Sequence, residues 1–243
     1  SDLRRQRQMC IRDRYNTLMV SETVIKNIKN FMFRFQECTK KCGDRAKLIA
    51  VSKKKDFQLI QLAYELGIKS FGENYPQELR DKNIQKTEKN LHFDWHFIGR
   101  LQKNKIKYVA GKADLIHSID NLELVEDVQD YCKKHNIKQK VLAQINISND
   151  PNKGGFLMKH LQSIIPKIEK KEHLQLCGFM TILEDNLQDG EIRDYYREMY
   201  KISQNYTFND DIEISMGMSK DYTIALEEGS TMVRVGTEIF GPR

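Results

Sequence analysis

The amino-acid sequence predicts an α/β fold, a (β/α)8 barrel of the TIM type preceded by one extra helix. Short apolar runs of strand character alternate with amphipathic helical patterns through almost the whole chain, which is typical of βα units. Eight such runs occur, the number that closes this barrel. A length of 243 residues without a linker rich in proline, glycine or serine also suits one barrel domain. An open doubly wound sheet is the alternative, but no G-x-G-x-x-G motif follows the first strand.

The eight predicted strands are residues 47–52, 69–72, 94–98, 115–118, 141–146, 175–180, 212–215 and 232–235. Between the first two strands, Asp56 can cap a helix that ends at Gly67. The apolar residues of that helix recur at the spacing i, i+3, i+4 and i+7, and they are Leu59, Leu62, Ala63 and Leu66. Similar patterns predict helices over residues 121–135 and 159–169, and residues 21–35 form the predicted extra helix.

The formal net charge of +6 does not indicate a nucleic-acid partner. Residues 1–14 contain five arginines and two aspartates, so the rest of the chain has 35 basic and 32 acidic residues, a net charge of +3. No basic stripe with interleaved aromatic residues occurs. No apolar run approaches the roughly 20 residues that span a bilayer. We therefore expect neither nucleic acid nor a membrane among the partners.

The first residues of the chain match neither a signal peptide, which needs an apolar segment, nor a transit peptide. They also lack an apolar period. Residues 1–18 are therefore predicted to be a disordered or extraneous leader, with a natural start at Met19. Residues 19–243 are predicted to form the single barrel domain.

The five cysteines are scattered and odd in number, which favours reduced thiols and a cytoplasmic protein. Cys38 and Cys42 form one pair, and His92 and His96 form another. The separation between the two pairs is far too long for a zinc finger. No metal site is expected.

Polar residues and glycines follow the carboxyl ends of the predicted strands, where a barrel of this type builds its binding site. They are Lys53, Glu73, Asn74, His96, Gly99, Ser118, Asn146, Thr181, residues 215–219, Gly236 and Thr237. Because loops are polar in any case, each member alone is a weak signal. The set as a whole predicts a site at this end of the barrel.

Lys53 is the candidate for covalent chemistry. Alternation along the first strand places Lys53 on the face of Ile49 and Val51, whereas Lys54 points the other way and Lys55 is leaving the strand. Burial lowers the pKa of an amine, which leaves the free base available to attack an aldehyde.

Two later segments predict a phosphate seat. Residues 215–219 follow the seventh strand and Gly236-Thr237 follow the eighth, and the loops after these strands often bind phosphate in this fold. A reactive amine and a phosphate seat together indicate pyridoxal 5'-phosphate. Arg234 lies within the last strand. It could instead be a structural arginine that forms a salt bridge inside the barrel.

The chain resembles the pyridoxal-phosphate homeostasis proteins, single-domain relatives of the alanine racemase barrel. The resemblance runs in order from about Leu48 to Gly241, and it implies an alanine racemase N-terminal-domain-like fold. The segments that carry it are Ala50-Val51-Ser52-Lys53, Phe71-Gly72-Glu73-Asn74-Tyr75, Trp95-His96-Phe97-Ile98-Gly99, Gln144-Ile145-Asn146, Gly178-Phe179-Met180-Thr181, Ser215-Met216-Gly217-Met218-Ser219 and the closing segment GSTMVRVGTEIFG.

The resemblance implies that pyridoxal 5'-phosphate is the cofactor and that Lys53 holds it as a Schiff base. Asn74 is then expected near the cofactor ring, and Arg234 is expected to face the pyridine nitrogen. A cation beside that nitrogen disfavours its protonation, so carbanion chemistry is discouraged. The predicted cofactor-binding residues are Lys53, Asn74, Met218, Ser219, Arg234, Gly236 and Thr237, with the phosphate on Ser219, Gly236 and Thr237.

The predicted function is vitamin B6 homeostasis: a cytoplasmic monomer stores pyridoxal 5'-phosphate or delivers it to PLP-dependent apoenzymes, without strong catalysis. The first alternative is an amino-acid racemase with Tyr75 as a second base. Because the sequence ends at Arg243, soon after the eighth strand, we expect the second domain of alanine racemases to be absent. The second alternative is a Schiff-base aldolase for sugar phosphates, which would bind no pyridoxal phosphate.

Overall fold

The computed structural model describes residues 2–43, 45–208 and 211–242, with side chains described from residue 21 onward. The first helix, α1, spans Asp2–Cys42, so the predicted extra helix is present. The predicted leader over residues 1–18 falls on the part whose side chains lie outside the described residues, and it stays a prediction.

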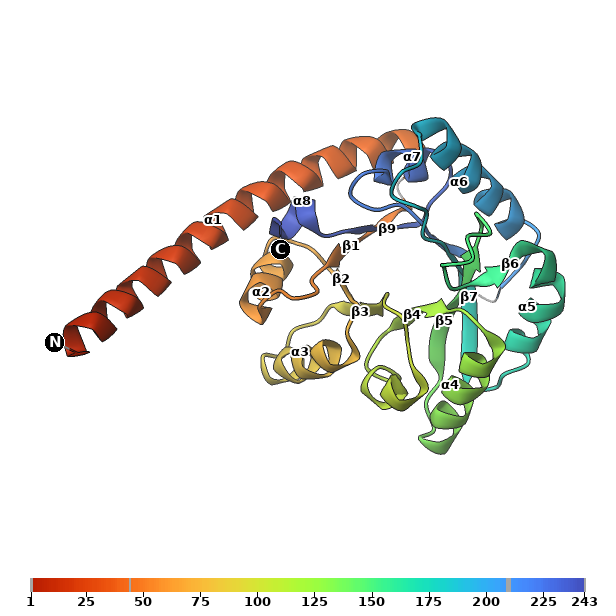
Figure 1. Ribbon diagram of the computed structural model, residues 1–243, viewed down its shortest axis with the longest axis horizontal. Coiled ribbons are helices and arrows are strands. Elements are labelled where there is room, and N and C mark those ends of the chain that lie inside the picture. The colour runs from red at the N-terminus through yellow and green to blue at the C-terminus, as the bar shows by residue number, and fades with distance from the viewer. Residues whose placement is uncertain (1, 44, 209–210, 243) are drawn as a thin grey trace.

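Eight parallel strands close into a barrel, which confirms the predicted fold (Figure 1). They are β1 (Lys47–Val51), β2 (Ser70–Glu73), β3 (Asp94–Phe97), β4 (Leu115–Ile119), β5 (Gln139–Asn146), β7 (Leu174–Met180), β8 (Glu213–Ser215) and β9 (Met232–Val235). Their order is β4-β3-β2-β1-β9-β8-β7-β5, and pairing of β4 with β5 closes the ring. The short β6 (Phe156–Leu157) adds to β5. Every predicted strand agrees with an observed one to within two residues at each end.

Helices surround the barrel. They are α2 (Phe57–Glu65), α3 (Pro76–Glu88), α4 (Leu122–Lys134), α5 (Leu161–Glu169), α6 (Asp189–Ser203), α7 (Tyr222–Glu227) and α8 (Thr237–Phe240), with 3-10 helices η1 (Lys103–Tyr108) and η2 (Met158–His160). A 3-10 helix, not an α-helix, therefore follows β3. Asn121 caps α4 by accepting the N–H of Leu124 at 2.8 Å. Asp56 precedes α2 as predicted, but its side chain makes no capping bond.

The carboxyl-terminal half of α1 packs beside α2, α7 and α8 (Figure 1). Its buried residues recur at helical spacing and form one apolar stripe: they are Val24, Ile28, Phe31 and Phe35. The ring of Phe31 contacts that of Tyr222, with centroids 5.2 Å apart. The extra helix thus covers the first and last βα units, where the barrel closes between β1 and β9.

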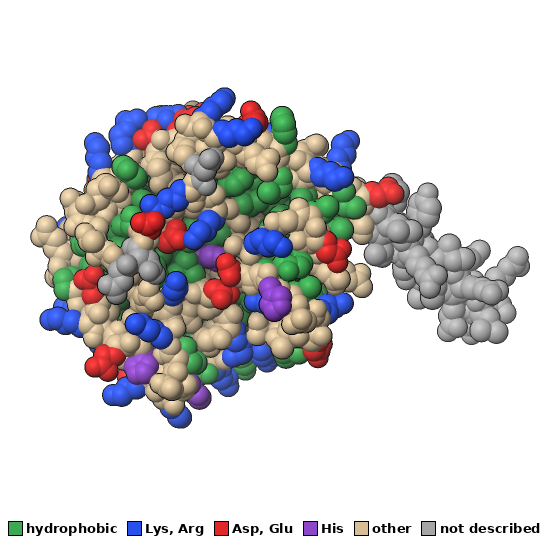
Figure 2. Space-filling view, turned by 180° about the vertical axis from the view of Figure 1, so that it is seen from behind, with side chains coloured by type: hydrophobic (Ala, Val, Ile, Leu, Met, Phe, Trp, Pro, Cys, Tyr) green, Lys and Arg blue, Asp and Glu red, His purple; other side chains and the backbone are tan. Residues whose placement is uncertain are grey.

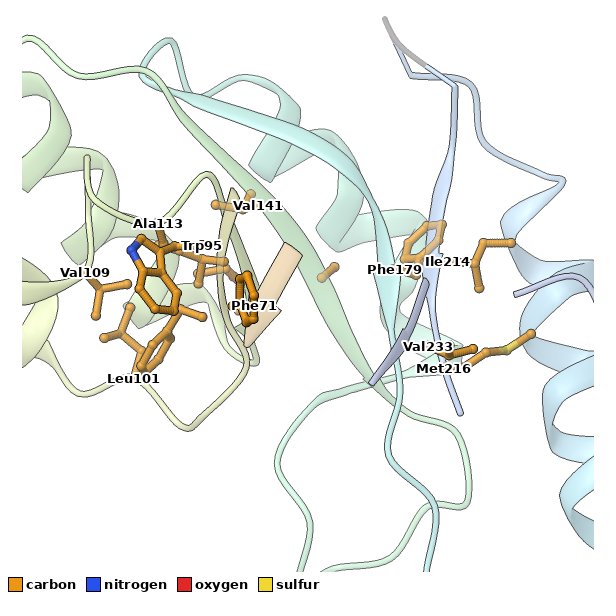
Figure 3. Packing of buried hydrophobic residues seen from close by; sticks show 14 of the residues in the cluster. Phe71, Trp95, Leu101, Val109, Ala113, Val141, Phe179, Ile214, Met216 and Val233 are labelled. Atoms are coloured by element: carbon orange, nitrogen blue, oxygen red, sulfur yellow. The ribbon is translucent and has the colours of Figure 1, made fainter. Parts of the chain in front are cut away.

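Strand alternation divides the core into two layers. The larger layer lies between strands and helices, and Figure 3 shows part of it, with Trp95 and Phe71 on one side and Phe179 and Ile214 on the other. The smaller layer fills the barrel and consists of Ile49, Leu115, Leu142, Cys177, Met180 and Met232. Because Ile49 belongs to the inner layer and Ala50 to the outer one, the strand alternation used to orient Lys53 holds in β1.

Gly99, which follows β3, is required by the close approach of two backbones. A Cβ at Gly99 would lie 2.1 Å from the backbone oxygen of Asn74. We expect Gly99→Ala to displace the end of β2 and to reduce the free energy of unfolding by roughly 3 kcal/mol. The melting temperature should fall by about 5–10 °C.

Gly190→Ala is the matched control, because nothing lies within 4 Å of the added carbon and Gly190 lies in the first turn of α6. Thermal unfolding of both variants tests the prediction. Equal melting temperatures for the two variants would contradict it.

Candidate functional site

The predicted site residues lie at the same end of four neighbouring strands. Lys53 follows β1 and Asn74 follows β2, which pairs with β1. On the other side of β1, Gly236-Thr237 follow β9, and Met218-Ser219 follow its neighbour β8. The sheet order therefore gathers residues from distant parts of the sequence at the carboxyl mouth of the barrel, while their roles toward a ligand stay predictions.

Of the three consecutive lysines, Lys53 is the one that continues the inward face of β1. It is half-buried and lies four residues after the inner-core residue Ile49. The ammonium of Lys55 donates to the carbonyl oxygens of residues 240–242, the shortest distance being 2.9 Å to Pro242. The ammonium of Lys54 lies 5.7 Å from the ring centre of Tyr75. Both flanking lysines are thus held by groups away from the inner face.

A buried polar network fixes the backbone just before Lys53. The Nζ of Lys82 donates to the carbonyl oxygen of Ser52 and to Oε1 of Glu73, both at 2.8 Å, and to Oε2 of Glu78 at 3.0 Å. The hydroxyl of Ser52 donates to the same Glu73 oxygen at 2.6 Å. Glu73 therefore belongs to the support behind Lys53, not to the barrel mouth where the sequence placed it. Sequence reasoning missed Lys82, although its i,i+4 spacing from Glu78 is a local signal.

Burial raises the pKa of Glu73 from 4.5 to about 7, against the opposing effects of Lys82 and Ser52. Between about pH 4.5 and 7 the folded chain then holds a proton that the unfolded chain releases, so raising the pH through this range reduces stability. We expect Glu73→Gln to remove this loss. Urea unfolding at about pH 5 and about pH 8 measures it.

The matched control is Glu88→Gln at the exposed end of α3, which should keep the pH dependence of the unaltered chain. A Glu73→Gln variant that still loses the same stability toward about pH 8 would contradict the assignment of this proton to Glu73.

The loop after β8 is held in a defined shape. Gly217 has φ of +94°, and an added Cβ there would lie 2.5 Å from that of Ala225. The N–H of Met218 donates to Oδ1 of Asp221 at 2.6 Å, and Oδ2 of Asp221 accepts the hydroxyl of Tyr196 at 2.8 Å. The backbone amide of Met218 is thus used within the protein. Any ligand contact from this predicted site residue would have to use another atom.

Across from this loop, Gly236 brings β9 against β1. A Cβ at Gly236 would lie 3.2 Å from the backbone oxygen of Val51. Thr237 then begins α8, whose first N–H groups face the same end of the barrel as Ser219. The two segments predicted to seat phosphate are therefore on adjacent strand ends.

Arg234 is buried inside the barrel, 4% exposed. Its Nη1 donates to Oγ of Ser215 at 2.5 Å, and its Nη2 donates to the carbonyl oxygen of Thr181 at 2.8 Å. Burial lowers the pKa of the guanidinium, whereas Tyr196 and Asp221 oppose this shift. No carboxylate within the described part of the chain pairs with Arg234, so the salt-bridge alternative fails there.

Several buried oxygens at the carboxyl ends of the strands have no hydrogen-bond partner among the described residues. They are Oδ1 of Asn74, Oγ of Ser118 and Oδ1 of Asn146. Leaving buried polar atoms unpaired is costly, so these atoms fit a site that a polar ligand completes. The described residues contain no group of three His, Cys, Asp or Glu side chains that could hold a metal ion.

Comparisons with known proteins agree with this geometry. Residues 27–243 match the family model described as alanine racemase, N-terminal domain. The chain is 34% identical over 224 residues to a protein of Aquifex aeolicus named pyridoxal phosphate homeostasis protein, covering 90% of this chain and 97% of that one. A protein of the same name from Synechocystis is 36% identical over 200 residues, covering 81% and 91%.

Solved structures give the same likeness. The structure of PipY of Synechococcus elongatus with PLP bound superimposes with a TM-score of 0.74 at 31% identity, covering 81% of this chain and 93% of that one. Alanine racemase of Corynebacterium glutamicum superimposes with a TM-score of 0.64 at 13% identity. It shares the fold, and the match covers 60% of its chain.

Proposed function

The chain belongs to the pyridoxal phosphate homeostasis proteins, within the alanine racemase N-terminal-domain family, and from this premise we propose that it binds, stores and delivers pyridoxal 5'-phosphate. One observation carries the proposal: a half-buried lysine at the end of β1 lies beside the two segments suited to an anion on β8 and β9. The relative that was solved with PLP bound shares this fold at 31% identity.

Different residues are proposed to bind the aldehyde and the phosphate of pyridoxal 5'-phosphate. Lys53 supplies the amine for the aldehyde, and Ser219, Gly236 and Thr237 supply a hydroxyl and backbone N–H groups for the phosphate. Oδ1 of Asn74, which is buried and has no partner among the described residues, would accept a hydrogen bond from the ligand. When bound, pyridoxal phosphate contributes an electrophilic aldehyde and a ring that can withdraw electrons.

Arg234 favours storage over catalysis. Its guanidinium is buried, and among the described residues its hydrogen bonds go to neutral oxygens alone, so no carboxylate is bonded to it directly. Placed beside the pyridine nitrogen, this charge opposes protonation of the ring and weakens it as an electron sink. We propose that amino-acid racemisation is at most a weak side activity of this chain.

The proposed function also includes a compartment, an oligomeric state and a class of partner. We place the protein in the cytoplasm as a monomer that passes the cofactor to PLP-dependent apoenzymes. The described part of the chain contains no helix with both the length and the apolar character of a membrane span. The scattered cysteines of the sequence accord with a reducing compartment.

The test is to mix the PLP-free chain with pyridoxal 5'-phosphate, record the visible spectrum, reduce with borohydride and map the modified residue by mass spectrometry. We expect a new visible band and a pyridoxyl mass on Lys53. A chain that takes up no cofactor would overturn the proposal, and the sugar-phosphate aldolase would then become the favoured function.

A further inference from the structure

A cavity of about 570 Å³ lies at the end of the barrel opposite Lys53. The first residue of each of six strands lines it, which fixes its position at the amino-terminal mouth. These residues are Lys47, Asp94, Leu115, Gln139, Glu213 and Met232. Figure 2 shows one face of the molecule, on which acidic and basic side chains lie interspersed with apolar ones. The cavity is separate from the candidate cofactor site.

His96 was expected at the carboxyl mouth of the barrel, but it lies within β3 and lines this cavity at the opposite end, so that expectation was wrong. His96 begins a chain of hydrogen bonds through the barrel. Nδ1 of His96 lies 2.9 Å from Nε2 of His117, and Nδ1 of His117 lies 2.9 Å from Oγ of Ser215. The same Ser215 oxygen accepts from Arg234. A continuous chain therefore connects the cavity to the guanidinium of the candidate cofactor site.

The donors and acceptors of this chain fix its direction. Arginine can only donate, so the Ser215 hydroxyl accepts from it and is left to donate its own hydrogen to Nδ1 of His117. Burial lowers the pKa of both histidines, that of His96 to about 3, so each ring carries one hydrogen. The hydrogen of His117 then lies on Nε2 and is donated to His96. The hydrogen of His96 consequently lies on its own Nε2.

Among the described residues, this Nε2–H has no acceptor. Nε2 of His96 is buried and has no hydrogen-bond partner within the described part of the chain. A buried donor without an acceptor costs more free energy than the same donor when paired, so a ligand that accepts from it is favoured. His96 is 4% exposed, and it lines the cavity together with three less polar residues, which are Leu115, Cys177 and Met232.

The surroundings define the charge of that ligand. The ammonium of Lys47 is near enough to act on His96 by its positive charge, which favours an anion between them. The same ammonium lies 2.7 Å from Oε1 of Glu213. The cavity lining as a whole contains four lysines and four carboxylates, which are Lys47, Lys112, Lys138, Lys140, Asp94, Asp114, Asp211 and Glu213. Because these charges balance, the lining offers no net attraction to an ion with several negative charges. One negative charge on an apolar body suits the cavity best.

We propose that the amino-terminal cavity binds a small monocarboxylate, one oxygen of which accepts the Nε2–H of His96. Its hydrocarbon part lies against Leu115, Cys177 and Met232. A larger apolar body buries more surface against these residues, so affinity rises with chain length until the cavity is filled.

The test uses the PLP-free chain, so its outcome does not depend on the proposed function. Acetate, butyrate and inorganic phosphate are titrated by calorimetry. We expect butyrate to bind more tightly than acetate by on the order of tenfold, because two more methylene groups are buried. Phosphate should bind at least as weakly as acetate. Equal affinities for the three anions, or no binding of butyrate, would overturn the site.

Variants locate the binding. His96→Phe should abolish butyrate binding, and Lys47→Met should weaken it severalfold. Lys201→Ala, on the exposed face of α6, is the matched control for loss of a surface charge and should leave binding unchanged. The Lys47 side chain is 55% exposed, so Lys47→Met is expected to fold. If His96→Phe does not fold, the affinity of Lys47→Met for butyrate tests the site. Unchanged affinity in Lys47→Met and in any folded His96→Phe would overturn the assignment.

The hydrogen-bond chain also links the cavity to Arg234, and this part rests on the proposed function. A carboxylate on His96 polarises the chain and strengthens the bond from Arg234 to Ser215. We expect saturating butyrate to slow release of pyridoxal phosphate from the loaded chain by a few fold, and His117→Phe to abolish this effect. An unchanged release rate would disprove the link, even where butyrate binds the PLP-free chain.

Discussion

Lys53→Ala is expected to abolish covalent retention of pyridoxal 5'-phosphate. Without the amine there is no bond to the aldehyde, and the proposed phosphate contacts of Ser219, Gly236 and Thr237 would remain as the chief attraction. We expect the borohydride-fixed label to fall to background. We also expect the dissociation constant of the cofactor to rise roughly 100-fold. Equilibrium dialysis and mass spectrometry after reduction measure both effects.

Neighbouring lysines are the matched controls for this experiment. Lys55 is held by three carbonyl oxygens at the chain end after α8, so Lys55→Ala should lower stability slightly and keep the label on Lys53. Lys54 has φ of +58°, a left-handed conformation, and its side chain lies over Tyr75. Lys54→Gly relieves that conformation and should also keep the label. Full labelling of the Lys53→Ala chain would refute the proposed attachment point.

The strands of this protein were predictable because each strand of the barrel is covered on both faces. Leu48 and Ala50 contact the helices while Ile49 fills the barrel, so the strand is a continuous apolar run with a clear end. The polar residues that follow these apolar runs then predicted which end of the barrel carries the site. The 3-10 helix that follows β3 was not predicted, because the segment Lys103–Tyr108 has no helical apolar period long enough to distinguish it from a loop.

The interior polar chain was not predictable in the same way. His117 lies within β4, where one polar residue in an apolar run gives no indication of its partner. Its two hydrogen bonds join residues 21 and 98 positions away in the sequence. Such pairings exist only once the barrel has closed, so local patterns cannot reveal them. The same is true of Lys82, whose bond to the carbonyl oxygen of Ser52 joins α3 to the end of β1.

Arg234 occupies the position with the largest expected effect after Lys53. Its two hydrogen bonds hold the side chain rigidly across the barrel, toward Ser215 and Thr181. Arg234→Glu places a buried carboxylate next to the carbonyl oxygen of Thr181, which cannot donate a hydrogen bond to it. An unpaired buried charge costs roughly 3–5 kcal/mol, so the melting temperature should fall by about 10 °C.

The same substitution is expected to change the chemistry of the loaded chain. A carboxylate in place of the guanidinium would favour protonation of the pyridine nitrogen and make the ring a better electron sink. We expect the slow side reaction with amino acids to rise at least about tenfold, since one unit of pKa corresponds to about 1.4 kcal/mol. Racemisation of alanine, followed by a chiral assay below the lowered melting temperature, measures it.

Two further variants separate charge from stability in this test. Arg234→Lys keeps the positive charge, so it should lose stability without gaining side activity. Arg234→Met removes the charge without adding a negative one, and its side activity should lie between those of the unaltered chain and Arg234→Glu. If all three variants react at the rate of the unaltered chain, Arg234 does not control the ring nitrogen, and the proposed electronic role of this residue is wrong.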